Sequence, residues 1–545
     1  MMTEMLFISG LNVKQGFKRS VLFHYIDRMC GFIYLNGLAY DTSKLSCLAH
    51  RGPDSSTIIN GEGETLVFHR LKVNGMSSLS NQPMTFDGRL HLLCNGEIYN
   101  HKALAAKYGI SPVSGSDCEI ILHLYQKIGF QAMVAELDGE FAFVLVTPEI
   151  VYAARDPYGV RAMYVGQSAE GFGIASEMKA LLEFPELTQF LPGHTATWGK
   201  QNPDNRVPRV EYRPYYTYPG RGKIQPAEPD IERLKLLLVQ AVEKRLLCDR
   251  KTATGLPSIG AYLSGGFDSS AIAAILQRLY PGQLETFSIG FADAPDLLYA
   301  RKVANHIGSK HHEVILQEAE ALAAIPEVIR AIESYDTTTV RASTMMYLLS
   351  KYIREKTGIK VMFSGEGSDE ASGSYRYFHQ APSAEAFQEE SLRLLQDLCF
   401  FDNLRADKSS AAWGLELRVP FLDLDFLKYY MTIAPKWKTQ KGLEKYALRQ
   451  TMRDYLPDEV LYRPKEAMSD GVSLHNRSWS TIIQETAMRQ TGIPEGLPAE
   501  KYWYKQIYTA RYPGREGLIP YYWVPKWCGD VQDPSARTLS IYNAI

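Results

Sequence analysis

Hydrophobic positions divide the chain into two regions with different periodicities. From residue 30 to about residue 198, short apolar or alternating runs are separated by turn residues, which is typical of β-strands. A longer stretch, residues 118–137, has apolar positions at helical spacing and predicts one helix among the strands. The expected strands lie in residues 29–37, 65–71, 90–97, 139–147, 150–156 and 172–177.

The second region alternates apolar runs with helical stretches. Residues 191–230 are rich in proline, glycine and polar residues and are typical of a linker. After an amphipathic helix that starts near residue 230, apolar runs at 258–264, 284–291 and 359–363 alternate with helices, which predicts a parallel sheet covered by helices. Helical patterning dominates from about residue 378. The expected division is a domain at 30–200, a linker at 201–228 and a second domain at 229–545.

Length and composition narrow the class of protein. A chain of 545 residues exceeds what one core can hold, so more than one domain is expected. The net charge of -2 gives no electrostatic reason to expect nucleic acid or a membrane as partner. The seven cysteines include no CxxC pair, so neither a zinc knuckle nor a disulfide framework is indicated. A reducing, cytoplasmic location is the expectation.

A glycine- and serine-rich loop lies where the strand around residues 258–263 gives way to a helix. The segment Ser264-Gly265-Gly266-Phe267-Asp268-Ser269-Ser270 would let the backbone approach a polyanion and would present N–H and hydroxyl donors to phosphate oxygens. Asp268 could hold Mg²⁺ against a pyrophosphate. From spacing alone, an ordinary strand-to-helix turn fits this composition as well.

A second polar loop follows the strand at residues 359–363. Its sequence is Ser364-Gly365-Glu366-Gly367-Ser368-Asp369-Glu370, at the kind of strand end where open α/β sheets bind ligands. A solvated acidic turn is the alternative. Because this loop and the first loop belong to the same sheet, we expect the second loop to contact magnesium and substrate.

Cys30 stands directly after Met29. A cysteine at an N-terminus carries its own base, because its α-amino group has a pKa of roughly 7.7–8.0 and can take the thiol proton directly or through a water. Here 28 residues precede Met29. The amine would be free only in a chain that begins at Cys30.

Taken together, these motifs resemble those of glutamine-hydrolysing asparagine synthetases of the eukaryotic type, from Met29 to the C-terminal DPSARTL stretch. The phosphate loop alone resembles that of the ATP-pyrophosphatases. The shared motifs include MCGF, AHRGPDSS, HRL, NGEIYNH, GSDCE, LDGEFAF and RDPYGVR in the first region and YLSGGFDSS, DTTTVRAST, FSGEGSDE, AAWGLELRVPFLD, RPKEAMSDGV and YYWVPKW in the second. The resemblance implies an N-terminal α+β domain with the four-layer αββα fold of the Ntn hydrolases. It implies a C-terminal α/β domain with the parallel sheet of ATP-pyrophosphatases and a helical C-terminal part.

For the first domain, the resemblance implies a glutaminase in which Cys30 attacks the side-chain amide of glutamine. Asn95 and Gly96 would form the oxyanion hole. The residues implied to bind glutamine are Arg70 at the α-carboxylate, Val73 through its backbone, Asn95, and Glu97 and Asp117 at the α-ammonium. Family members usually follow Arg70-Leu71 with a small or aliphatic residue, then Val and Asp, whereas this chain has Lys72-Val73-Asn74-Gly75.

For the second domain, the resemblance implies adenylation of aspartate by ATP and attack of ammonia on β-aspartyl-AMP. Asp268 and Asp369 would hold Mg²⁺, Glu366 would be the base that deprotonates the nucleophile, and Lys465 would neutralise phosphate charge. Thr338 and Arg341 are implied at aspartate or pyrophosphate, with a plain salt bridge as the alternative for Arg341. The residues implied to bind ATP are Leu263, Ser264, Gly265, Gly266, Asp268, Ser269, Ser270, Ile289, Ser364 and Gly365.

The partners so implied are aspartate, glutamine and ATP, and family analogy allows a homodimer. A β-lactam-forming synthetase shares this architecture but has typically lost the glutaminase residues, which are present here. A non-catalytic relic would have lost the nucleophile or the phosphate loop, and neither is lost. We expect residues 1–29 to be absent from the mature protein, through initiation at Met29 and removal of that methionine. Proteolytic removal of a prosegment is the other route.

Overall fold

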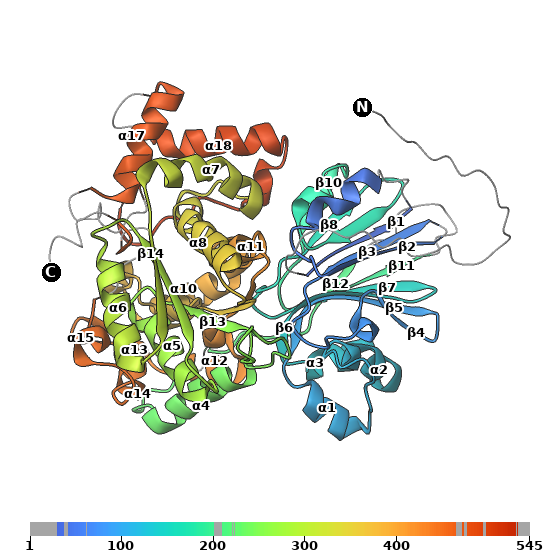
Figure 1. Ribbon diagram of the computed structural model, residues 1–545, viewed down its shortest axis with the longest axis horizontal. Helices are drawn as coiled ribbons and strands as arrows, with labels where there is room; N and C mark the ends of the chain where they lie inside the picture. Colours follow the sequence, from blue (N-terminus) through green and yellow to red (C-terminus); the bar gives the residue numbers. More distant parts are fainter. Residues whose placement is uncertain are drawn as a thin grey trace.

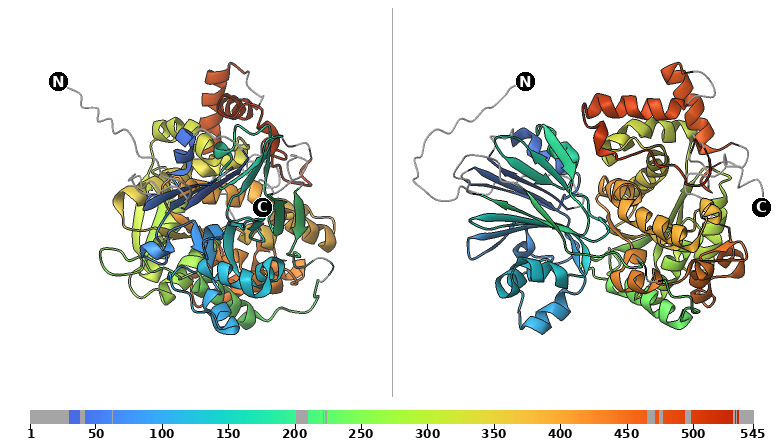
Figure 2. Two further views of the ribbon diagram at one scale, coloured as in Figure 1. Left: turned by 90° about the vertical axis from the view of Figure 1, so that its right-hand side faces the viewer. Right: turned by 180° about the vertical axis from the view of Figure 1, so that it is seen from behind.

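Two domains lie side by side in the computed structural model of the protein (Figures 1 and 2). The expected absence of residues 1–29 concerns a segment outside the described residues. The structure describes residues 30–37, 42–61, 63–200, 210–220, 222, 224–464, 471–473, 477–493, 498–529, 531 and 533.

The first domain contains two antiparallel six-stranded sheets. In the first sheet the strand order is β10-β8-β9-β1-β3-β2, and in the second it is β12-β11-β7-β6-β5-β4. The strands of the first sheet are β1 (Gly31–Asn36), β2 (Ser55–Gly61), β3 (Glu64–Arg70), β8 (Tyr164–Gln167), β9 (Phe172–Ala175) and β10 (Glu186–Gln189). Those of the second are β4 (Met84–Phe86), β5 (Leu90–Ile98), β6 (Gly139–Val146), β7 (Ile150–Arg155), β11 (His194–Gly199) and β12 (Glu211–Pro214).

The alternation of side chains along β1 explains why this strand is apolar throughout. Phe32 and Tyr34 point into the core between the two sheets, while Ile33 and Leu35 belong to the core on the other face of their sheet. The outer face of the second sheet is covered by α1 (His101–Tyr108), α2 (Glu119–Ile128) and α3 (Phe130–Glu136). The short 3₁₀ helices η1 (Thr42–Leu48) and η3 (Met178–Ala180) lie on the other side. The layer order agrees with the predicted αββα fold.

Two local features of this domain differ from the sequence expectation. The helix predicted over residues 118–137 is broken between α2 and α3 at Gly129, whose φ of 75° ends the first helix. In addition, β12 lies within the expected linker, where it pairs with β11 and extends the second sheet. Strand β12 is held in the sheet by backbone pairing with β11 and has no apolar run that would predict it.

The second domain is built on the parallel sheet that the alternating pattern predicts. Its strand order is β15-β14-β13-β16-β17, and every neighbouring pair is parallel. The strands are β13 (Ile259–Tyr262), β14 (Glu285–Gly290), β15 (Lys310–Ile315), β16 (Val361–Phe363) and β17 (Glu416–Arg418).

Helices cover both faces of this sheet and dominate the C-terminal part (Figure 1). Among the described residues, no helix is long and apolar enough to cross a membrane. The helices are α4 (Ile231–Lys244), α5 (Phe267–Leu279), α6 (Pro295–Ile307), α7 (Glu318–Ile332), α8 (Thr337–Lys356), α9 (Ser368–Ser372), α10 (Ala384–Asp397), α11 (Asp402–Ala411), α12 (Leu424–Tyr430), α13 (Pro435–Lys438), α14 (Tyr446–Thr451), α15 (Asp458–Leu461), α17 (Trp479–Thr491) and α18 (Ala499–Arg511).

Buried ion pairs join the two domains. Asp407 on α11 lies 2.9 Å from Arg51 and 3.3 Å from Arg161, both from the first domain. Arg245, just after α4, lies 2.8 Å from Glu140 on β6. Breaking a buried pair leaves an uncompensated charge, at a cost of about 3–5 kcal/mol, so these contacts fix how the domains dock.

Candidate active sites

Cys30 lies directly before β1, next to the end of β3. The backbone N–H of Leu71 donates a hydrogen bond to its Sγ at 3.2 Å. Burial raises the pKa of the Cys30 thiol to about 12, and the hydrogen bond from Leu71 opposes this only in part. At neutral pH the thiol is therefore protonated, and a nucleophilic role requires a base.

The sequence predicts Asn95 and Gly96 as the oxyanion hole, and both lie on β5. The Nδ2 of Asn95 is buried and has no hydrogen-bond partner in the part of the chain that the structure describes. Gly96 has φ of 148°, and a Cβ there would lie 2.1 Å from the carbonyl oxygen of Glu140. A glycine is thus required beside an unsatisfied amide donor, the arrangement that would receive a developing oxyanion.

Arg70, at the end of β3, is held by four acceptors. Its Nη1 donates to the carbonyl oxygen of Ser77 at 3.1 Å and to Oδ1 of Asn81 at 2.7 Å. Its Nη2 donates to the carbonyl oxygens of Asn74 at 3.0 Å and Gly75 at 2.5 Å. The guanidinium is therefore firmly oriented on the loop that follows β3.

Glu97 and Asp117, the predicted ligands of the glutamine α-ammonium, are both buried. Desolvation raises the pKa of Glu97 well above its usual range, and the neighbouring charge of Asp117 raises it further. Desolvation also raises the pKa of Asp117, although the Ile98 N–H donates to its Oδ2 at 2.6 Å. A cation held between the two carboxyl groups would offset the cost of ionising them.

Val73, the remaining predicted contact of glutamine, has its carbonyl group engaged with the other domain. Its oxygen accepts hydrogen bonds from the backbone N–H groups of Asp249 at 3.1 Å and Arg250 at 3.0 Å. A carbonyl oxygen has two lone pairs, and both are used here.

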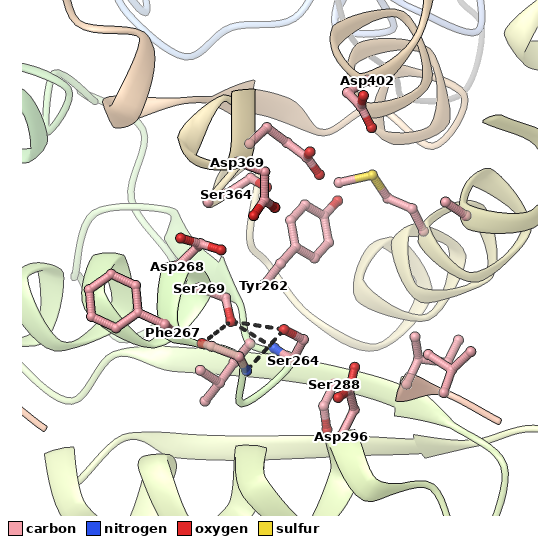
Figure 3. A pocket seen from close by; sticks show the side chains of 18 of the residues that line it. Tyr262, Ser264, Phe267, Asp268, Ser269, Ser288, Asp296, Ser364, Asp369 and Asp402 are labelled. Atoms are coloured by element: carbon pink, nitrogen blue, oxygen red, sulfur yellow. Dashed lines mark hydrogen bonds between the residues drawn. The ribbon is translucent and has the colours of Figure 1, made fainter. Parts of the chain in front are cut away.

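The second site is a cavity of about 180 Å³ at the carboxyl ends of β13 and β16 (Figure 3). Strand β13 ends at Tyr262, and the loop after it leads into α5, so the first N–H groups of that helix face the cavity. Ser269 Oγ accepts a hydrogen bond from the Ser264 N–H at 3.1 Å and lies 3.0 Å from Ser264 Oγ. These bonds close the loop into a cradle.

The structure brings most of the predicted nucleotide-site residues together. The lining includes Leu263, Ser264, Gly266, Asp268, Ser269, Ile289, Thr338, Ser364, Gly365, Glu366 and Asp369. The Oγ1 of Thr338 is buried and has no hydrogen-bond partner among the described residues, as expected of a group that awaits a ligand.

Four predicted residues stand apart from this lining. Gly265 has φ of 72° and would clash with the Ala300 backbone N at 2.4 Å if it carried a Cβ, so it shapes the loop. Ser270 is fully buried on α5 and does not line the cavity. Arg341 forms a bidentate ion pair with Glu500 and also contacts Asp533 at 2.9 Å. Lys465 lies outside the described residues.

Lys445 is a residue that the sequence reasoning missed. Its Nζ lies 2.5 Å from Oδ2 of Asp268 and 2.5 Å from Oδ1 of Asp369, so one cation joins the two acidic loops. Ser368 Oγ donates to the other oxygen of Asp268 at 2.6 Å. A lone lysine ahead of a short helix looks solvated in sequence, and only the fold brings it to both carboxylates.

Helix α11 supplies further missed residues. Asp402 and Arg405 line the cavity, and Arg405 lies 2.9 Å from Glu366 and 2.8 Å from Asp402. The predicted base Glu366 is thus held by an arginine. Asp296 and Arg463, a pair at 2.7 Å, also line the cavity.

Comparison with known proteins covers both domains. A model named "Asparagine synthase" matches residues 233–393 and 380–528, and one named "Glutamine amidotransferase domain" matches residues 29–194. The chain is 43% identical to a Bos taurus protein named "Asparagine synthetase [glutamine-hydrolyzing]" over 570 aligned residues, which cover 95% of this chain and 99% of the relative.

The chain belongs to the asparagine synthetase family. Proteins with the same name from Gallus gallus and Homo sapiens are 43% and 42% identical, with the same coverage of each chain. The family predicted from the sequence motifs is therefore confirmed over both domains. As an asparagine synthetase, the chain carries its amidotransferase domain on the two antiparallel sheets and its synthetase domain on the parallel sheet.

Proposed function

We propose that this asparagine synthetase converts ATP, aspartate, glutamine and water into AMP, pyrophosphate, asparagine and glutamate. The observation that carries the proposal is the cavity at the ends of β13 and β16, where Asp268, Asp369 and Lys445 converge at the start of α5. Paired carboxylates, a buried cation and a helix N-terminus suit a Mg²⁺-bound polyphosphate.

In the first domain, the Cys30 thiolate attacks the side-chain amide carbon of glutamine. The C–N bond breaks, ammonia leaves with the proton taken from the thiol, and water then hydrolyses the thioester to glutamate. The unsatisfied Nδ2 of Asn95 supports its role as a donor to the tetrahedral oxyanion. The buried carboxyls of Glu97 and Asp117 suit the α-ammonium, and Arg70 suits the α-carboxylate.

The base for Cys30 is its own α-amine in this proposal. A thiol with pKa raised to about 12 cannot ionise unaided near neutral pH. An amine with a pKa of roughly 7.7–8.0 can accept its proton. The active form therefore begins at Cys30, with residues 1–29 removed.

In the second domain, a carboxylate oxygen of aspartate attacks the α-phosphorus of ATP, and pyrophosphate leaves. Asp268 and Asp369 would hold Mg²⁺, which would neutralise phosphate charge and orient the leaving group. Both carboxylates already share the ammonium of Lys445, which fits a small cation site completed by phosphate oxygens and water. The N–H groups of the 264–268 loop and the hydroxyls of Ser264 and Ser269 would bind the phosphates.

Ammonia from the first domain then attacks the β-carbonyl carbon of β-aspartyl-AMP, and AMP leaves. Glu366 lines the cavity and can accept the proton that nitrogen loses. Its pairing with Arg405 at 2.9 Å orients the carboxylate before the nucleophile arrives. Arg341 pairs with Glu500 and Asp533 away from the cavity lining, so its contribution is to packing around the site. Lys465 would neutralise charge on the phosphates.

We also propose that the enzyme works in the cytoplasm and forms a homodimer.

The test of the function is an assay of AMP, pyrophosphate and glutamate with aspartate, glutamine, ATP and Mg²⁺. Formation of all three in an aspartate-dependent reaction is expected. Absence of AMP and glutamate from protein with a free Cys30 amine would overturn the proposal.

A further inference from the structure

Asn74 bridges the glutamine site and the other domain. Its side chain is 7% exposed and lies on the loop that follows β3. The Nδ2 group donates a hydrogen bond to Oε2 of Glu97, and Oδ1 accepts one from the backbone N–H of Asp249 at 3.1 Å. The two contacts fix the orientation of the amide, because the reverse orientation would oppose two acceptors and two donors.

The backbone holds this loop in place without the Asn74 side chain. The Val73 carbonyl oxygen accepts from the N–H groups of Asp249 and Arg250, at 3.1 and 3.0 Å, and the Gly75 N–H donates to Oδ2 of Asp249 at 2.9 Å. Gly75 also has φ of 60° and leaves no room for a Cβ, which would lie 2.2 Å from Ser80 Oγ. What the Asn74 side chain adds is therefore a directed donor to Glu97.

Glu97 needs such a donor because its surroundings disfavour its charge. Asp117 and Glu416 raise the pKa of its carboxyl in addition to burial, while Arg418 and Arg161 lower it. The guanidinium of Arg418 is 3.6 Å away at the other carboxylate oxygen, Oε1. The Asn74 amide thus serves the oxygen that Arg418 does not reach, and a hydrogen bond to an ionised acceptor favours the ionised form.

We infer that Asn74 is a positioning residue for glutamine recognition: it holds the Glu97 carboxylate toward the α-ammonium of the substrate and anchors it to the synthetase domain through Asp249. The inference rests on the proposed role of Glu97 as a ligand of that ammonium.

The test measures ligand binding in the full chain with Cys30→Ala, which prevents turnover. The two ligands are L-glutamine and 4-carbamoylbutanoate, the same molecule without its α-amino group. In titration calorimetry, with competition for the weaker ligand, Asn74→Leu should raise the Kd for glutamine about tenfold, because a charge-assisted hydrogen bond is lost at similar volume. The Kd for 4-carbamoylbutanoate should stay within twofold.

Asn74→Asp keeps the acceptor for the Asp249 N–H but adds a carboxylate beside Glu97. It should weaken glutamine binding at least as much as Asn74→Leu does. Met76→Ala, at an exposed position of the same loop, is the matched control and should change neither constant. Ammonia-dependent asparagine synthesis, measured with Cys30 intact, should be unchanged in every variant.

Two results would overturn the inference. If Asn74→Leu weakens the binding of both ligands equally, the Asn74 side chain has only a structural role. If it leaves both unchanged while Glu97→Gln weakens glutamine, Glu97 binds the ammonium without help from Asn74. If Glu97→Gln also leaves the glutamine Kd unchanged, Glu97 does not bind the α-ammonium. That result would refute both the proposed role of Glu97 and the inference about Asn74.

Discussion

The Nζ of Lys445 lies 2.5 Å from Oδ2 of Asp268. The same ammonium contacts Asp369 on the second acidic loop, at 2.5 Å from its Oδ1. These loops follow the neighbouring parallel strands β13 and β16, so the fold brings two negative charges to one edge of the sheet. The Lys445 ammonium offsets the repulsion between the two carboxylates, and the edge of the sheet is a preformed site for a charged ligand.

Lys445→Met should therefore abolish adenylation while sparing the other domain. Without the ammonium, the repulsion between Asp268 and Asp369 increases, and the two loops should separate. We expect aspartate-dependent AMP formation to fall at least about 100-fold, the equivalent of roughly 2.7 kcal/mol. Glutamine hydrolysis is the internal control and should stay within about threefold. Equal loss of both activities would point to general unfolding instead.

The sequence predicted the architecture of both domains more completely than the residues of the second site. A short apolar run before turn residues identified β1, and alternating strands and helices identified the parallel sheet, because each pattern records which positions are buried. Gly129 broke a helix that the apolar spacing alone made continuous. Lys445 and Arg405 went unnoticed, because isolated basic residues carry no local signal and acquire meaning only when the fold brings carboxylates to them.

Removal of the Asn95 amide should damage the glutaminase alone. Asn95→Ala takes away the buried, unsatisfied donor that faces the proposed oxyanion. The expected loss in kcat for glutamine hydrolysis is about 10²–10³-fold. Ammonia-dependent asparagine synthesis should be unchanged, and a parallel fall in that activity would contradict the assignment.

Glutamine affinity should weaken as the pH falls. The pKa values of Glu97 and Asp117 are both raised by burial, so these carboxyls take up protons at a higher pH than ordinary acidic residues. Once neutral, they lose their attraction for the α-ammonium, which stays charged. The Kd for glutamine in the Cys30→Ala protein should rise from pH 8 to pH 5, and the Glu97→Gln variant should show a flatter profile. A wild-type profile as flat as that of the variant would refute this explanation.

Lys438 should make folding stability depend on pH above neutrality. It is fully buried, donates to the Ala371 carbonyl oxygen at 2.9 Å, and desolvation lowers its pKa to about 7 from 10.5. Between these values the unfolded chain binds more protons, so the contribution of Lys438 to the free energy of unfolding rises with pH.

The difference in unfolding free energy between wild type and Lys438→Met isolates this contribution. It should increase by up to about 1.4 kcal/mol per pH unit from pH 7 to pH 10, in favour of wild type. Denaturant titrations at four pH values would measure it. A difference that stays constant over this range would show that the lysine keeps its charge when buried.

Glutaminase activity should require a chain that begins at Cys30. With residues 1–29 attached, the amine of Cys30 is part of a peptide bond and cannot accept the thiol proton. Intact mass and N-terminal sequencing of the native protein should therefore find Cys30 first. Glutamine-dependent activity in a preparation that retains Met1 throughout would contradict the proposed base, whereas ammonia-dependent synthesis there would not.

The amide nitrogen of glutamine should become the amide nitrogen of asparagine within this one protein. The direct measurement supplies aspartate, ATP, Mg²⁺ and glutamine labelled with ¹⁵N at the side-chain amide, and follows the label by NMR. We predict ¹⁵N in the asparagine amide, with one AMP per labelled asparagine. Unlabelled asparagine amide, or ATP cleaved to ADP in place of AMP, would contradict the account.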